Sequence, residues 1–421
     1  MLQRSGALDG KSADYNKIAK AVSLLSKQGV NIRPVDINKS QKDFTLDADK
    51  NEIHFGLAGV KGLKEKVIEK IIALGPFESL HDFIEKTAAD IASITVLIKA
   101  GAFDDFDSRI DNIEKIALLK SGLKTKLDGQ NLLMLSRKNF WPQDTDELVA
   151  SQKIFNFSQY LKKLSKEELS AEGYEEKEWY ALDDRACEFL GKLEFNHDGF
   201  AINAKAWKHV YDIAMTPIKN YLKEYQEEML EKVNIKIMQD WKEKYFPNDD
   251  FAQWEIEAMG ICFSEHPMQN VINVGDFDEL PAEPEIATVF KTQTGRTVPL
   301  YRLSRICGVV IAKDKLHSSI TLLTPTGPVE VKFRKEQFAH YDSQISQQVG
   351  GKKKVIERSW FNRGVGLVIQ GMRQDDQFLA KGYKNSPMKH TAYKITQILD
   401  NGKFEVQTER KKGQSEESND E

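Results

Sequence analysis

The hydrophobic pattern of this 421-residue chain changes near residue 300, and that change limits the fold more than any other feature. Before it, apolar residues recur at three- and four-residue spacing, which predicts helices over 14–28, 64–73, 79–86, 93–100 and 217–245. After it, short runs rich in β-branched residues alternate with turn residues, which predicts strands. The sequence therefore predicts an α+β chain whose N-terminal two-thirds are mostly helical.

The β-rich part of the sequence has the spacing of a small barrel. The predicted strands are 307–312, 320–324, 329–333, 365–372, 377–381 and 392–398. A candidate helix at 336–341 follows the third strand. Five or six short strands within about 100 residues suit a small closed barrel.

Composition excludes several classes of protein. Charged residues make up 29% and hydrophobic residues 40% of the chain, which is typical of a globular protein. The sequence has no apolar run of 18 residues and no apolar N-terminal leader, so neither a membrane span nor a secretory signal is predicted. Cys187, Cys262 and Cys307 lie far apart, so we expect no disulfide framework and a reducing, cytoplasmic location.

The net charge of −4 hides an uneven distribution of charge. Residues 141–295 hold 16 basic and 31 acidic residues, whereas residues 296–396 hold 18 basic and 7 acidic residues. A basic block inside an acidic chain indicates a polyanionic partner, and a solvated basic face without a ligand is the alternative. The polar residues 401–421 are predicted to form a disordered tail.

Residues 55–68 have the pattern of two helices joined by a tight glycine turn, a helix-hairpin-helix. Such a turn lets the backbone approach a phosphate, and the N–H groups that open the next helix then point at the anion. Contacts of this kind hold DNA without reading its sequence. The candidate residues are Gly59, Lys61, Gly62, Lys64 and Lys66. The alternative is an ordinary helical hairpin stabilised by Gly62.

These segments together resemble the C-terminal half of the alpha subunit of bacterial DNA polymerase III, a C-family polymerase. Residues 55–61, Phe-Gly-Leu-Ala-Gly-Val-Lys, resemble the family's FGL-x-x-(I/V)-K entrance to its helix-hairpin-helix, and residues 33–44 resemble the end of its fingers. Residues 75–83, 97–104 and 259–268 follow in family order. Lys64 and Glu265 stand where the family has glycine, which suggests a divergent, phage-encoded or plasmid-borne member.

The resemblance implies a division of the chain into parts. These are a late fingers segment at 1–50, the hairpin and a clamp-peptide linker at 51–140, an acidic helical region at 141–295, an OB-fold at 296–400 and the tail. An OB-fold suits single-stranded DNA because it pairs a cationic groove with aromatic platforms. The candidate DNA contacts on it are Lys313, Lys315, Lys332, Arg334, Arg358, Trp360, Arg363 and Arg373. Core packing is the alternative for Trp360 and Phe361, and alternation along the strand predicts Phe333 in the core.

A possible sliding-clamp peptide lies in the neighbourhood where the family carries one. Gln130, Leu132, Leu133 and Met134 supply the glutamine and the large apolar groups that such a peptide needs. A buried amphipathic segment fits the same residues equally well.

No catalytic residue and no metal site is predicted in this chain. The family's polymerisation site uses palm aspartates that hold two metal ions, and the resemblance places that palm, with two Mg²⁺ ions, on a separate chain. The pairs Asp104-Asp105, Asp183-Asp184 and Asp249-Asp250 are most simply solvated loops or caps. Whether the chain counts as an enzyme therefore stays open; it is expected to be a component of a DNA-directed DNA polymerase, a nucleotidyltransferase.

The resemblance implies that the chain holds duplex and single-stranded DNA, and the clamp if the peptide is real, while a palm-bearing partner performs nucleotidyl transfer in a bacterial cytoplasm. Two alternatives stay open. One is a non-enzymatic single-stranded-DNA-binding or replisome scaffold protein, and the other is a fragment of a longer polymerase. No membrane partner is expected.

Overall fold

The computed structural model describes residues 14–411 except 165–166, 168, 170–171, 176, 272–273, 276, 350–351 and 384–389. Residues 412–421 of the predicted tail lie outside the described residues. The prediction of disorder is wrong for residues 404–410, because β16 (Phe404–Gln407) pairs with a neighbouring strand and the buried Arg410 pairs with Glu357 at 3.1 Å. The chain forms two compact units: the main unit, Met1–Lys115 with Asn248–Glu421, and the middle unit, Ile116–Pro247. The domain boundaries expected from the resemblance stay predictions.

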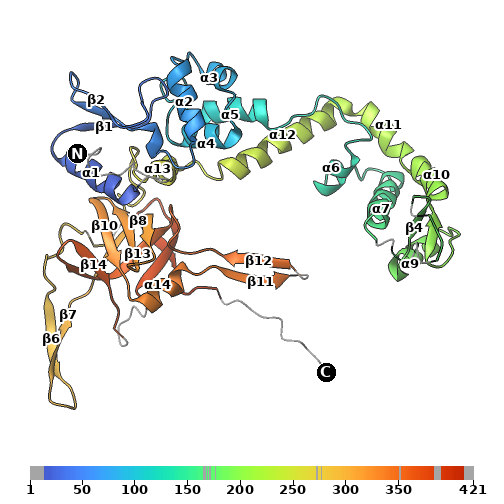
Figure 1. Cartoon of the computed structure of the whole chain (residues 1–421). Helices are drawn as coiled ribbons and strands as arrows, with labels where there is room; N and C mark the ends of the chain where they lie inside the picture. The colour runs from blue at the N-terminus through green and yellow to red at the C-terminus, as the bar shows by residue number, and fades with distance from the viewer. Residues whose placement is uncertain are drawn as a thin grey trace. The chain divides into compact units, whose positions relative to one another are not determined.

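The N-terminal half of the main unit is mostly helical (Figure 1). Its helices are α1 (Tyr15–Lys27), α2 (Glu65–Leu74), α3 (Leu80–Thr87), α4 (Ile91–Lys99) and the start of α5 (Arg109–Lys120). Side chains cap the starts of α1, α3 and α4, where Asp14, Ser79 and Asp90 accept backbone hydrogen bonds three residues ahead. A 3-stranded sheet of β1 (Asn31–Arg33), β3 (Glu52–His54) and β2 (Thr45–Asp47) lies among them. The four helices predicted in this region are present.

A five-stranded barrel forms the C-terminal half of the main unit. Its elements are β8 (Ser304–Asp314), β9 (Ser319–Thr324), β10 (Gly327–Lys332), α14 (Lys335–Asp342), β13 (Gly366–Gln374) and β14 (Gln377–Ala380). The order is β14-β10-β9-β8-β13, and β13 closes the barrel by pairing with β14. Three strands, a helix and two further strands, with β10 and β14 parallel, are the topology of an OB-fold. The predicted fold class, a mostly helical N-terminal region followed by a small OB-fold barrel, is confirmed.

Further strands extend this barrel. β15 (Ala392–Ile398) and β16 (Phe404–Gln407) continue the sheet beside β13. Two hairpins are separate from it, β6 (Ile286–Lys291) with β7 (Thr297–Tyr301) and β11 (Ile345–Val349) with β12 (Lys352–Glu357). The sequence analysis did not predict these hairpins. Every side chain of β6 is exposed, so no core pattern marks that strand.

The barrel core consists of aliphatic side chains from its strands together with aromatic rings from outside them. Ile306, Val310, Leu322, Val331, Leu367, Ile369 and Phe378 fill the interior. Trp360 and Phe361 join this core, and the Trp360 ring stacks on Tyr341 with ring centroids 5.4 Å apart. Phe333 is also buried, as predicted from strand alternation.

The middle unit is helical apart from one short strand pair. Its elements are the end of α5, α6 (Leu132–Arg137), α7 (Asp146–Leu161), β4 (Trp179–Ala181), α9 (Asp184–Lys192), β5 (Ala201–Asn203), α10 (Ala204–Ala214), α11 (Thr216–Glu224) and α12 (Gln226–Tyr245). The single long helix predicted over 217–245 is wrong, because Tyr225 (φ −107°, ψ 32°) leaves the helical conformation between α11 and α12. No glycine or proline marks this break. In the described part of the chain, no helix is both long and apolar enough to cross a membrane.

Candidate nucleic-acid interface

The predicted hairpin is a short 3-10 turn, η2 (Leu57–Gly59), joined to α2 by a glycine turn. Gly62 has φ +87°, a conformation that side chains disfavour, and no atom lies within 4 Å of the place where its Cβ would be. The turn therefore presents open backbone just before the N-terminus of α2. Gly59 has a different task, since a Cβ there would lie 2.5 Å from the Phe55 ring.

Lys64 replaces a family glycine without straining this turn. Its backbone is extended (φ −79°, ψ 142°), so the left-handed conformation falls on Gly62 instead. Its ammonium group pairs with Asp90, and this hydrogen bond lowers the pKa of the Asp90 carboxyl to about 2. Together with the exposed Lys61 and Lys66, the turn carries three lysines within six residues.

Lys61 ties the hairpin to α13 (Phe251–Met259). Its backbone N–H donates to the carbonyl of Ala258 at 2.8 Å. Although Lys61 is exposed overall, partial desolvation of its amine and the nearby guanidinium of Arg363 lower the pKa of that amine. The hairpin and the barrel thus meet at one junction, where Glu257 lies near both Lys61 and Arg363.

A buried ion pair holds α13 against the start of α5. The Glu255 side chain is 0% exposed and accepts a 2.6 Å hydrogen bond from Arg109. The backbone N–H groups of Phe263 and Ser264 donate to its other oxygen at 2.7 and 2.8 Å. Asp104 contacts Arg109 at 2.9 Å from outside. Sequence reasoning missed Arg109 and Glu255, because nothing in a local pattern distinguishes a buried charge from a solvated one.

Three of the barrel residues predicted to contact DNA instead make contacts within the protein. Arg363 lies over the Tyr15 ring at 3.6 Å and donates to the carbonyls of Ile311 and Glu257. Arg373 covers the Phe277 ring at 4.3 Å and donates to the Phe277 and Leu280 carbonyls.

Trp360 is the third, with 0% exposure, and its indole N–H donates to Glu357 at 3.0 Å. Burial raises the pKa of Glu357, but hydrogen bonds from Trp360, Gln407, Arg410 and the backbone of Lys411 lower it overall. The core-packing alternative therefore describes Trp360 and Phe361 in this structure.

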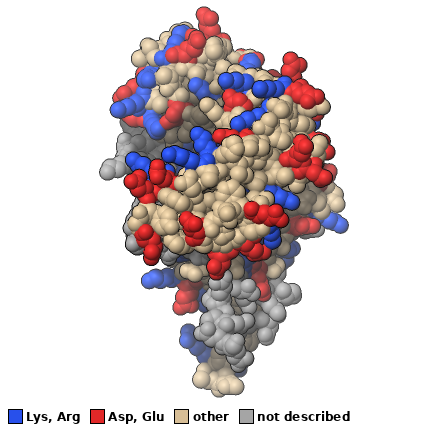
Figure 2. Space-filling view, turned by 90° about the vertical axis from the view of Figure 1, so that its right-hand side faces the viewer, with Lys and Arg blue, Asp and Glu red and all other residues tan. Residues whose placement is uncertain are grey.

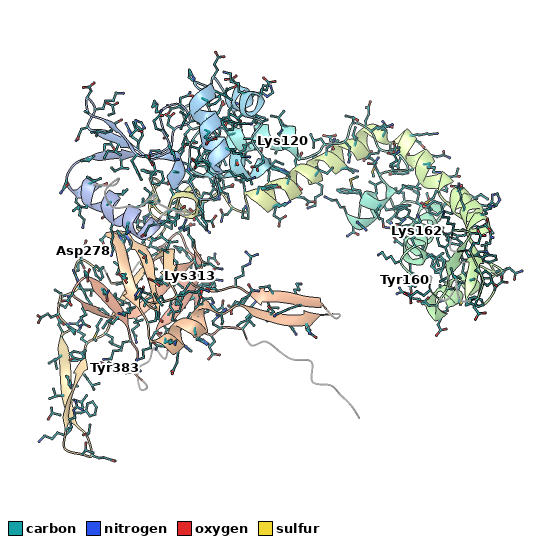
Figure 3. All side chains as sticks on the ribbon, viewed as in Figure 1. Lys120, Tyr160, Lys162, Asp278, Lys313 and Tyr383 are labelled. Carbon is teal, nitrogen blue, oxygen red and sulfur yellow. The ribbon has the colours of Figure 1, made fainter. Side chains whose placement is uncertain are left out.

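The other five barrel candidates share one end of the barrel, called here the basic end: Lys313, Lys315, Lys332, Arg334 and Arg358. Lys313, labelled in Figure 3, pairs with Asp342 at the end of α14. Lys315 pairs with the same carboxylate at 3.2 Å. The backbone of Phe333 donates to Ser318, which places its two basic neighbours beside the loop between β8 and β9. Arg358 is exposed next to Ser359, whose hydroxyl donates to Asp342.

The outer face of β9 and β10 is covered by the chain itself. OB-folds commonly bind oligonucleotides on the face of their second and third strands. Here all of β9 is buried, α1 packs against β8 and β10 (Figure 1), and Lys20 of α1 pairs with Glu330 of β10 at 3.8 Å. The candidate cations consequently lie at the basic end of the barrel, where Lys313 and Lys315 pair with Asp342, and not on that face.

His266 completes the cover over β9. The Met268 N–H donates to its Nδ1 at 3.0 Å, so the proton sits on Nε2, which contacts the Leu323 carbonyl at 3.1 Å. Burial lowers the pKa of the imidazole to about 4. His266 is a neutral packing residue.

The acidic pairs act in caps and ion pairs. Asp105 pairs with Lys39 at 2.6 Å, and Asp183 and Asp250 cap the starts of α9 and α13. Among the described residues, no three His, Cys, Asp or Glu side chains form a group that could hold a metal ion.

The predicted clamp segment forms α6 of the middle unit. Leu132 is 2% exposed, and Leu133 and Met134 pack partly against the same core, while Gln130 is exposed. The burial of Leu132 favours the alternative of a buried amphipathic segment, and the contact with a sliding clamp stays a prediction.

Comparisons with known proteins agree with these features. A helix-hairpin-helix motif model matches residues 29–111. A probable DNA polymerase, YorL, of Bacillus subtilis and a DNA-directed DNA polymerase of Bacillus phage SPbeta are each 33% identical over 417 residues, which is 95% of this chain and 31% of theirs. The DNA polymerase III alpha subunit of Deinococcus radiodurans is 36% identical over 110 residues, 24% of this chain and 8% of its own length. This chain thus spans about a third of the phage polymerase.

The predicted resemblance is therefore confirmed: the chain has a helix-hairpin-helix and is homologous to DNA polymerase III alpha and to these phage and Bacillus polymerases. This homology supports a role related to DNA polymerases.

Proposed function

We propose that this chain, a homologue of bacterial and phage DNA polymerases, is the part of a C-family replicative polymerase that holds DNA. Nucleotidyl transfer would be performed by a separate palm-bearing chain with two Mg²⁺ ions, in the cytoplasm of a bacterial cell. The observation that carries the proposal is the turn at Gly62. Its backbone is open and left-handed, the N-cap of α2 follows two residues later at Lys64, and lysines lie on either side.

The two basic regions would serve different forms of DNA. The hairpin suits the duplex, because backbone N–H groups and lysines grip phosphates without reading bases. The basic end of the barrel suits a single strand leaving the duplex, because five cations gather there within one unit. The buried Arg109–Glu255 pair fixes the helical region to α13.

The sliding clamp is a further proposed partner through residues 130–134. For that contact to form, Leu132 must leave the core of the middle unit, so we expect it to be weak. Removing the glutamine by Gln130→Ala should leave the fold intact, because that side chain is exposed.

Co-purification separates this proposal from its rival, a non-enzymatic scaffold. The tagged chain is expressed with a candidate palm-bearing chain, and DNA affinity and nucleotide incorporation are measured for each chain and for the pair. The proposal expects DNA binding by this chain alone and incorporation only by the pair. DNA binding without recruitment of a palm-bearing chain would support the scaffold, and incorporation by this chain alone would overturn both.

A further inference from the structure

The middle unit contains an open groove of about 620 Å³ between α6, α7 and α9. Its walls carry five basic side chains, which are Arg137, Lys153, Lys163, Arg185 and Lys192. Glu188 is the acidic residue among the lining residues, and it pairs with Lys192 at 2.7 Å. The groove is therefore positively charged.

This charge is local to the groove. Residues 116–247 hold 20 basic and 22 acidic residues in total. Figure 2 shows Lys and Arg interspersed with Asp and Glu over the visible face. Elsewhere in the unit, acids neutralise lysines, as Asp240 does for Lys138 at 2.6 Å and Lys236 at 3.0 Å. By contrast, Arg137, Lys153 and Lys163 make no ion pair with any described residue.

Helical periodicity lines these cations up along the groove. Lys153, Asn156, Tyr160 and Lys163 recur at three- and four-residue spacing along α7 and the turn after it, so they share one side. Ten residues of helix span about 15 Å.

Aromatic rings form the floor of the groove. Phe157 is buried and stacks on the half-buried Phe189 with ring centroids 4.1 Å apart, so it supports the Phe189 ring from below and joins α7 to α9. Tyr160 lies beside them on α7 (Figure 3), held by a hydrogen bond to Asp183, and Arg185 lies 5.2 Å from the centre of its ring. Single-stranded nucleic acid binds where cations lie beside aromatic rings, because the cations pair with the phosphates and the rings stack on the bases. An acidic peptide would use the cations but not the rings.

We propose that this groove binds the phosphate backbone of single-stranded DNA, as a site separate from the hairpin and the barrel. The proposal rests on the proposed function, since it assumes that the chain handles DNA. It assigns to the middle unit the task of holding a strand at a second point.

Charge removal tests the proposal on the full chain. One variant combines Arg137→Gln, Lys153→Gln and Lys163→Gln. The control combines Lys205→Gln, Lys208→Gln and Lys223→Gln, which removes three exposed charges of the same unit that do not line the groove. Affinity for an oligothymidine strand is measured across a salt titration, and circular dichroism checks that both variants fold.

The groove variant should bind the strand at least tenfold more weakly at about 100 mM salt, and the slope of log affinity against log salt should fall by about 2, because three phosphate contacts are lost. The control should change neither quantity. A photo-crosslinking residue at Gln159, which lines the groove, should crosslink to the strand in the wild-type background.

Each outcome has one meaning. If the wild-type chain binds the strand but the two triple variants bind it equally well, the groove proposal is wrong and the proposed function stands. If the wild-type chain binds no DNA, the proposed function fails as well. If the groove variant loses affinity for polyglutamate and not for DNA, the occupant is an acidic peptide and the proposal is overturned.

Discussion

Replacing Gly62 by alanine tests whether the hairpin turn touches DNA. An L-residue in the left-handed conformation costs about 1–2 kcal/mol, and the reduced freedom of the unfolded chain returns about 0.4–1 kcal/mol. No clash adds to this cost, because no atom lies within 4 Å of the new Cβ position. Gly62→Ala should therefore lower the free energy of unfolding by about 1 kcal/mol and leave the chain folded.

Duplex affinity should respond more strongly than stability. Relaxing the turn towards negative φ withdraws backbone N–H groups from a phosphate. Losing one phosphate contact lowers the salt slope by about 0.9 and affinity by about five- to tenfold at about 100 mM salt. Urea unfolding and fluorescence anisotropy with a labelled duplex measure the two quantities.

Gly29→Ala is the matched control, because Gly29 has φ +81° and equally open surroundings in the same unit. It should lose the same stability and keep its duplex affinity. If both variants bind the duplex as the wild type does, the hairpin does not hold the DNA backbone and the reasoning is refuted.

Four further variants test the rest of the interface. Glu255→Ala should cost about 3–5 kcal/mol of unfolding free energy in urea, because it leaves the buried Arg109 charge unpaired; a loss below about 1 kcal/mol would contradict the role of this pair. As the pH falls from about 6.5 to about 4, His266 is protonated in the unfolded chain but stays neutral in the folded one, so the free energy of unfolding should decrease by up to about 3 kcal/mol. His266→Gln should flatten this dependence of stability on pH, and an unchanged profile would count against the buried neutral imidazole. Arg358→Gln should weaken single-strand binding without loss of stability, whereas Trp360→Phe should cost about 2 kcal/mol of stability and leave binding unchanged; the reverse pattern would restore Trp360 as a stacking platform.

Local signals in the sequence predicted much of the fold. Asp14, Ser79 and Asp90 precede apolar periodic segments, and each caps the helix expected after it. The barrel strands were visible because alternation and turn residues act over a few positions. The break at Tyr225 was not visible, since a helical pattern continues through it.

The site was harder to predict, because it depends on contacts between distant segments. Trp360 and Arg363 belong to a basic, aromatic stretch that fits a DNA groove, yet the structure uses them to join the barrel to its surroundings. Nothing in the sequence near β10 indicates that α1, some 300 residues away, packs against it. The exposed lysines at Gly62 could be predicted because a tight turn exposes its own neighbours.

The affinity of the purified chain for a primer–template duplex, measured by anisotropy from low to high salt, tests the central proposal most directly. We expect clear binding at about 50 mM salt and little dependence on DNA sequence. Affinity should fall steeply with salt, and the slope of log affinity against log salt should correspond to several phosphate contacts. Absence of binding at low salt, or binding that salt does not weaken, would contradict a chain built to hold the DNA backbone.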